Sequence, residues 1–145
     1  ITLDEGISIE LGLQDKLQRI VSLILNDEGL VDNEINLKIL NDKEMKKLNQ
    51  QFRNKNNTTN VLSFQNDDIS LMQTKNIGDI AISLEYVQRE AKEEGKFFED
   101  HMIHMLAHGV YHILGYDHED DASAEIMESK EIQILAKLKI NNPYN

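Results

Sequence analysis

The chain has 145 residues, of which 40% are hydrophobic, 28% are charged and none is cysteine, and its formal net charge is −11. This length and apolar content predict one globular domain over residues 1–145, and the lack of cysteine excludes disulfide bonds and thiolate metal ligands. There is no apolar run of 18 residues and no signal-peptide pattern, so we expect a cytoplasmic protein without a membrane span.

The first third of the chain alternates predicted strands and helices. Apolar and polar side chains alternate over residues 7–11 and again over residues 35–40, which predicts two half-buried strands. Apolar residues at helical spacing predict a helix over residues 13–25 between them. Asn41 or Asp42 is the predicted N-cap of a second helix, which carries another apolar stripe.

Two loops and two strands are predicted in the middle of the chain. Residues 53–60 are rich in Asn, Lys and Thr without periodicity, which indicates a loop, and residues 66–76 indicate another. Residues 61–64 and 77–83 are the predicted strands that follow them.

The last third is predicted to be helical. Three helices are expected over residues 84–94 between Ser83 and Gly95, over residues 97–114, and from Asp121 or Ser123 to Leu138. The whole pattern predicts an α+β fold, with α/β as the alternative, in which a small mixed sheet of about four strands packs with four to five helices.

All five histidines lie between residues 101 and 118. On a helix, His108 and His112 project from the same face one turn apart. Gly115 suits the left-handed conformation that ends a helix, and a turn there would bring His118 back as a third ligand. This H-x-x-x-H-x-x-G-x-x-H spacing resembles the metal-binding helix and turn of the metzincins, and it predicts one zinc ion held by three imidazoles.

Other residues of this segment qualify that prediction. Zinc proteases carry a glutamate base directly after the first histidine, and Gly109 stands there instead, so peptide hydrolysis by that route is not expected. The alternative to a metal site is an ordinary polar seam of histidines. His101 and His104 are assigned structural or hydrogen-bonding roles around the ligands, and Asp117 is expected either to orient an imidazole or to cap a turn.

The charge is unevenly distributed along the chain. Residues 36–60 contain six basic and two acidic side chains, a net charge of +4, which leaves −15 for the remainder. This segment is either a solvated helix face or a surface that contacts nucleic-acid phosphates, with Lys46, Lys47 and Lys55 as the candidate contacts.

The motifs together resemble one known family. Residues 108–118 read H-G-x-x-H-x-x-G-Y-D-H, a pattern typical of the YbeY family of bacterial endoribonucleases, including the glycine where proteases carry glutamate. Similar segments occur over most of the chain, at residues 48–53, 61–64, 78–80, 127–128 and 143–144.

The resemblance implies a zinc-dependent endoribonuclease that cleaves single-stranded RNA in ribosomal RNA maturation and ribosome quality control. Arg53 is the expected catalytic residue, because a guanidinium can grip a phosphate through two nitrogens. No general base is evident, so a water activated by zinc and the ribose hydroxyl are alternative nucleophiles. Small-subunit proteins or a ribosome-associated GTPase are the expected protein partners.

The loop after Arg53 departs from the family pattern. Asn56 and Asn60 replace acids, and two prolines are replaced by polar residues, which predicts a looser loop around the arginine. Two other functions are weighed against the nuclease. The first is a zinc-stabilised, ribosome-associated binding module with little nuclease activity, and the second is a metalloprotease, which Gly109 disfavours.

Overall fold

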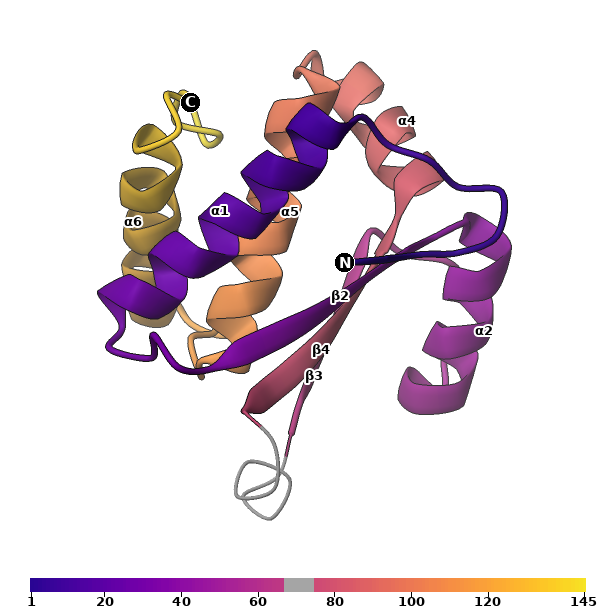
Figure 1. Ribbon diagram of the computed structural model, residues 1–145, viewed down its shortest axis with the longest axis horizontal. Coiled ribbons are helices and arrows are strands. Elements are labelled where there is room, and N and C mark those ends of the chain that lie inside the picture. The colour runs from indigo at the N-terminus through magenta and orange to yellow at the C-terminus, as the bar shows by residue number, and fades with distance from the viewer. Residues whose placement is uncertain (67–74) are drawn as a thin grey trace.

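A four-stranded mixed β-sheet forms the centre of the molecule (Figure 1). The computed structural model describes residues 1–66 and 75–145, so most of the predicted loop over residues 66–76 lies outside the described residues. The strands lie in the spatial order β1 (Thr2–Leu3), β2 (Glu34–Leu40), β4 (Asn76–Ser83) and β3 (Val61–Gln65). Strands β1, β2 and β4 are parallel, and β3 pairs antiparallel with β4.

Five helices within the described ranges cover the sheet: α1 (Leu11–Asp27), α2 (Asp42–Arg53), α4 (Leu84–Glu94), α5 (Phe98–Ile113) and α6 (Asp121–Ala136). Helices α1, α5 and α6 lie on one side of the sheet, and α2 lies on the other (Figure 1). The predicted α+β class is therefore confirmed. In residues 1–66 and 75–145, no helix combines the length and the apolarity that a membrane span requires.

The main core lies between the sheet and the layer formed by α1 and α5. The predicted stripe of α1 is buried and includes Leu13, Leu17 and Ile20. Helix α5 is buried along almost its whole length, with His108 and His112 only half-buried. Beyond its first turn, the helix is therefore open to solvent only where these two histidines lie.

A smaller core lies under α2, on the opposite face of the sheet. Met45 is fully buried there against Leu40, Leu62 and Ala81. Phe52, on the same helix, is 56% exposed and meets the Phe64 ring edge-on with the ring centroids 5.3 Å apart.

The strand predicted over residues 7–11 is wrong. Residues 7–10 form no ladder, Leu11 already begins α1, and the edge of β2 is instead paired with β1. The backbone turns away after Asp4, whose carbonyl accepts the Ile7 amide at 3.0 Å. Ile7 and Ile9 nevertheless pack on the main core. The alternation of apolar and polar residues therefore arises from an irregular segment that buries one side.

The helix ends agree with local capping rules. The Asn41 side chain accepts the Glu44 amide at 2.9 Å, and the Ser83 hydroxyl accepts the Tyr86 amide at 3.4 Å. Helix α6 begins at Asp121, one of its two expected first residues, and the Asp120 side chain caps it by accepting the Ser123 amide at 2.7 Å.

Candidate active site

Three histidines converge at the end of α5. His108 and His112 stand one turn apart, and the chain reverses at Gly115, whose φ is 98°. This left-handed residue lets the Tyr116 amide bond the Tyr111 carbonyl at 3.0 Å. His118 then approaches the first two, and one nitrogen of each histidine lies within 4.8 Å of the others. The structure thus brings together the three predicted ligands, while their likeness to a metzincin site stays a prediction.

The hydrogen-bond partners decide which nitrogens of these rings carry protons. His108 Nδ1 lies 3.2 Å from Glu131 Oε2, and His112 Nδ1 lies 3.1 Å from the Tyr116 carbonyl. Ionised carboxylate and carbonyl oxygens only accept hydrogen bonds, so each Nδ1 must donate. The two Nε2 atoms, 3.0 Å apart, are then both acceptors.

Two acceptor nitrogens at this separation repel each other unless a cation or a proton lies between them. Burial lowers the pKa of His112, and the neighbouring His108 and His118 lower it further, which favours the neutral ring that a metal requires. Three converging imidazoles without a thiolate are a donor set that suits zinc. The residues therefore fit the ion that the sequence predicts.

Glu131 of α6 is the residue of this site that sequence reasoning missed. Its side chain is 0% exposed, and its Oε1 lies 2.6 Å from His104 Nε2 and accepts the Tyr144 hydroxyl at 2.8 Å. Burial alone would raise the pKa of Glu131, but the hydrogen bonds from His104 and His108 lower it to about 2. A charged residue between the buried Met127 and Ile134 was the available signal, because that spacing points it inward.

The neighbouring polar residues have separate partners. His104 belongs to the Glu131 network, as its predicted hydrogen-bonding role requires, whereas His101 is buried with its Nε2 2.7 Å from Glu90 Oε1. Asp117 accepts the Glu119 amide at 3.3 Å. Of the two roles expected for Asp117, this contact supports the turn cap.

Gly109 allows α5 to lie directly on strand β3. A Cβ atom there would meet Ser63 Oγ at 3.0 Å, Ile80 Cδ1 at 3.2 Å and Val61 Cγ2 at 3.3 Å. The position therefore faces the sheet, and it has no room for the glutamate that zinc proteases carry.

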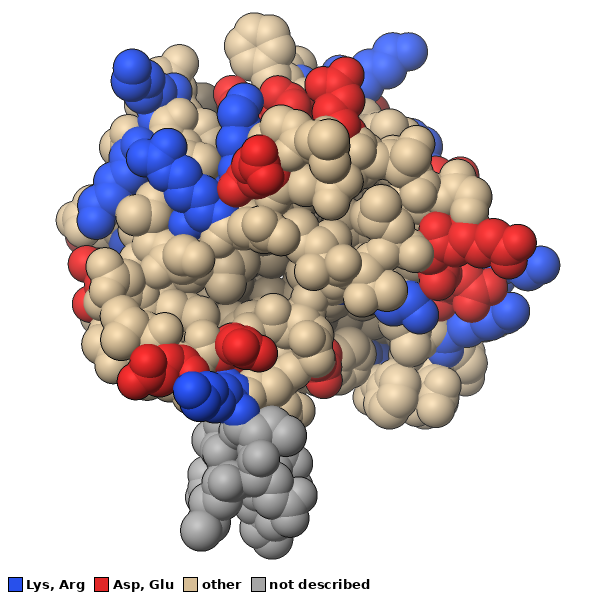
Figure 2. Space-filling view, in the orientation of Figure 1, with Lys and Arg blue, Asp and Glu red and all other residues tan. Residues whose placement is uncertain are grey.

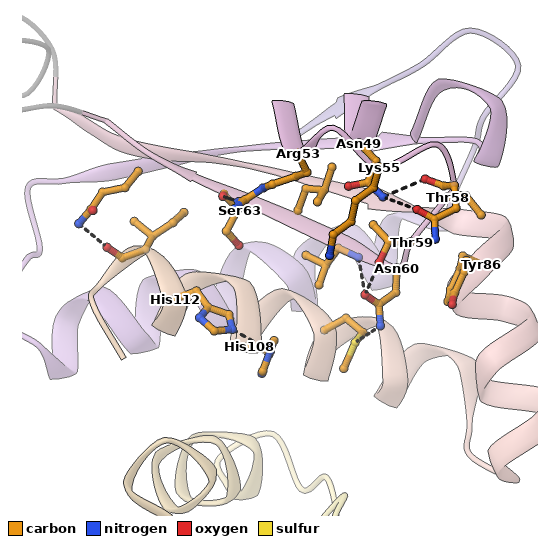
Figure 3. A pocket seen from close by; sticks show the side chains of 16 residues that line it. Asn49, Arg53, Lys55, Thr58, Thr59, Asn60, Ser63, Tyr86, His108 and His112 are labelled. Carbon is orange, nitrogen blue, oxygen red and sulfur yellow. Dashed lines mark hydrogen bonds between the residues drawn. The ribbon is translucent and has the colours of Figure 1, made fainter. Parts of the chain in front are cut away.

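A cleft of about 690 Å³ opens beside the histidines (Figure 3). His108 and His112 line it from α5, while Arg53 and Lys55 line it from the end of α2 and the loop that follows. Lys55 extends into the space between this loop and α5 (Figure 3). In the described part of the chain the lining contains no carboxylate, although the net charge of the protein is −11. The cleft is thus a locally positive site on an acidic protein.

Arg53 is held by strand β3. Its Nη2 donates to the Ser63 carbonyl at 2.8 Å, and its guanidinium carbon lies 5.6 Å from the centre of the Phe64 ring. Arg53 is also the last residue of α2, and Asn54 ends the helix with φ of 56°. The arginine is therefore placed by a strand and a helix end, in addition to the loop that follows it.

The altered loop over residues 54–60 is anchored by hydrogen bonds. Buried Asn49 donates to the Asn57 carbonyl at 2.8 Å, and Thr58 donates to Asp42 at 3.1 Å. At the far end, the Asn60 amide donates to Glu90 Oε1 at 3.1 Å. These contacts give the loop fixed points at positions where the sequence predicted loosening.

The remaining candidate RNA contacts lie apart from the cleft lining. Lys46 and Lys47 are exposed on α2, and Lys47 pairs with Glu44 at 3.3 Å. On the face shown in Figure 2, acidic and basic side chains lie interspersed around a largely uncharged centre. Of the three lysines, only Lys55 lines the cleft.

Comparisons with known proteins agree with one another. The family model described as Endoribonuclease YbeY matches residues 3–139. Endoribonuclease YbeY of Alteromonas mediterranea is 42% identical over 142 residues, which cover 98% of this chain and 90% of the relative. That of Francisella tularensis subsp. tularensis is 43% identical over 138 residues, covering 90% and 80%. The solution structure of TM1509 from Thermotoga maritima matches with a TM-score of 0.67 and 28% identity, over 94% of this chain and 87% of that chain.

Proposed function

The chain belongs to the YbeY family of endoribonucleases, and on that premise we propose that it acts as a single-domain, zinc-dependent endoribonuclease that cleaves single-stranded RNA. Ribosomal RNA is the proposed substrate, in maturation and ribosome quality control in the cytoplasm. Proteins of the small ribosomal subunit or a ribosome-associated GTPase are the proposed partners.

The observation that carries the proposal is the composition of the cleft. One wall presents His108 and His112, and the other presents Arg53 and Lys55, without a carboxylate among the described lining residues. An RNA backbone is a polyanion, so it is attracted to such a cleft and repelled from most of an acidic surface. A single strand of RNA can place one phosphate between the two walls, and it can place the adjacent phosphates along the loop of residues 54–60.

The residues of this chain have distinct proposed roles. His108, His112 and His118 would hold the zinc ion, which supplies Lewis acidity toward a phosphoryl oxygen and activates water. Arg53 binds the reacting phosphate, because its planar guanidinium can donate two parallel hydrogen bonds and stabilise charge that builds on the oxygens. Lys55 neutralises a neighbouring phosphate. The described lining offers no carboxylate base, so these side chains bind and orient the RNA.

RNA cleavage by purified variants tests the proposal. We expect Arg53→Ala to reduce kcat/KM on a single-stranded oligoribonucleotide by about 10²–10³-fold, as loss of one charge-stabilising donor does. Arg19→Ala is the matched control, since Arg19 is an exposed arginine of α1 outside the cleft, and it should cleave within twofold of the parent.

Two outcomes would overturn the assignment. Equal cleavage by the parent and by Arg53→Ala or His112→Ala would show that the measured nuclease is a contaminant. Tight RNA binding without cleavage by the zinc-loaded parent would instead support the binding-module alternative.

A further inference from the structure

Helix α6 carries a carboxylate that packing alone does not require. Glu131 lies on the buried side of the helix among the apolar residues Met127, Ile134 and Leu135. A buried carboxylate loses its hydration and is tolerated only when donors satisfy its oxygens. Its partners therefore indicate what the residue does.

Three donors converge on the two oxygens of Glu131. The Tyr144 hydroxyl donates to Oε1, since the carboxylate can only accept. His104 Nε2 lies 2.6 Å from Oε1, and its buried Nδ1 has no partner in the described structure. A proton on Nδ1 would be a buried unpaired donor, so His104 carries its proton on Nε2 and donates it. The third donor is Nδ1 of His108, which lies 3.2 Å from Oε2.

The third contact connects this network to the candidate metal centre. By holding the proton on Nδ1, Glu131 turns the Nε2 lone pair of His108 toward His112 and His118. A carboxylate partner also makes an imidazole a stronger metal donor. His112 has only the Tyr116 carbonyl for this purpose, so the two helical ligands are supported unequally.

The same carboxylate reaches the end of the chain. Tyr144 follows α6 in a segment without helix or strand, and its ring meets the His104 ring edge-on with centroids 5.4 Å apart. Burial and the Glu131 carboxylate raise the pKa of Tyr144, which keeps its hydroxyl protonated and able to donate. The Tyr144 hydroxyl thus connects residues 141–145 to Glu131, which in turn contacts the proposed ligand His108.

We propose that Glu131 is a positioning residue of the metal centre, and that through Tyr144 the binding of the metal is coupled to docking of residues 141–145. The inference rests on the metal site of the proposed function, but not on RNA cleavage. Coupling of this kind is reciprocal: if a docked terminus raises metal affinity, then bound metal strengthens docking by the same factor.

Zinc affinity, measured by competition with a chromophoric chelator, tests the first part. Glu131→Gln keeps the shape but leaves one acceptor oxygen for three donors, and we expect zinc affinity to fall by about 10–100-fold. Tyr144→Phe should lower it by about threefold to tenfold. Tyr111→Phe is the matched control, because it removes another hydroxyl between α5 and α6, bonded to the Lys130 carbonyl at 3.4 Å, and it should bind zinc as the parent does.

Amide hydrogen exchange of residues 141–145 tests the coupling. Zinc should slow exchange there in the parent and in Tyr111→Phe, but not in Tyr144→Phe. Parental zinc affinity in Glu131→Gln, or exchange of the terminus that ignores zinc in the parent, would overturn the inference. If Glu131→Gln does not fold, zinc affinity and amide exchange of Tyr144→Phe test the inference alone, because phenylalanine keeps the ring that packs against His104.

The outcomes separate this inference from the proposed function. A parent that binds zinc with the expected coupling but cleaves no RNA refutes the nuclease and leaves the coupling in place. If the parent cleaves RNA but Glu131→Gln binds zinc as tightly as the parent, the coupling is refuted and the nuclease assignment stands.

Discussion

The Ser63 hydroxyl donates to the Gly109 carbonyl at 3.1 Å, which ties strand β3 to helix α5 one residue after the proposed ligand His108. The carbonyl of Ser63 accepts the Arg53 guanidinium at 2.8 Å. One residue of the sheet therefore fixes both walls of the cleft relative to each other.

Close packing at Gly109 predicts a cost for any larger residue. Gly109→Ala should lower the free energy of unfolding by about 1–2 kcal/mol, because the new methyl group is forced against Ser63 and Val61. Gly12→Ala is the control, since Gly12 lies in α1 with nothing within 4 Å of its added Cβ, and it should be neutral or stabilising by up to about 1 kcal/mol. Urea denaturation measures both. An unchanged stability in Gly109→Ala would contradict the close approach.

Replacing Arg53 by lysine tests whether the guanidinium shape matters in addition to its charge. Arg53→Lys should reduce kcat/KM for RNA by at least about tenfold, because an ammonium cannot donate to Ser63 and grip a phosphate with a planar fork. Zinc stoichiometry and thermal stability should stay at parental values, since Arg53 is exposed and is not a candidate ligand. Full activity in this variant would leave the arginine with a purely electrostatic role.

Metal analysis tests the ligand set. The native protein should contain one zinc ion per chain, and His118→Ala should lose it, because two helical histidines alone leave the site short of a ligand. His101→Gln is the control, as His101 lies on the same helix but pairs with Glu90, and it should keep its zinc. Retention of stoichiometric zinc by His118→Ala would refute the site.

Removal of the metal should also lower stability. A ligand that binds only the folded state stabilises it by about 2.7 kcal/mol at a free concentration 100 times its dissociation constant. A chelator should therefore reduce the melting temperature of the parent, whereas it should leave that of His118→Ala unchanged. Equal melting temperatures of the parent with and without chelator would contradict a bound ion.

The ionisation of Glu131 predicts acid sensitivity of the metal-free protein. Its pKa is lowered from 4.5 to about 2 on folding, so the carboxylate stabilises the fold above pH 4.5, and this contribution is lost as the pH falls toward 2. The loss should be on the order of 3 kcal/mol. Urea denaturation between pH 6 and pH 2 should show a steeper fall for the parent than for Glu131→Gln. Parallel curves would show that Glu131 does not titrate in this way.

The sequence predicts well what local chemistry decides. Ser83 and Gly95 bound α4 as expected, because a capping hydroxyl and a left-handed glycine act within a few residues. The convergence of His108, His112 and His118 was predictable for the same reason, since one helical turn and the turn at Gly115 set their positions.

Non-local contacts were not predictable in this way. The segment over residues 7–11 alternates like a strand, but β1 occupies the edge of β2, and no local pattern records that competition. Glu131 meets His108 across 23 residues, so only its burial within α6 hinted at a role. The roles of Lys46 and Lys47 in RNA binding stay predictions.

Helix α5 contributes many residues to the hydrophobic core, and it also contains two of the proposed zinc ligands, His108 and His112. A chemical centre mounted on a mobile lid can lose its geometry while the rest of the molecule stays intact. Here the histidines share their backbone with Met102, Leu106 and Val110 of the interior. Heat inactivation of the enzyme and cooperative melting of the protein should therefore occur as one event at one temperature.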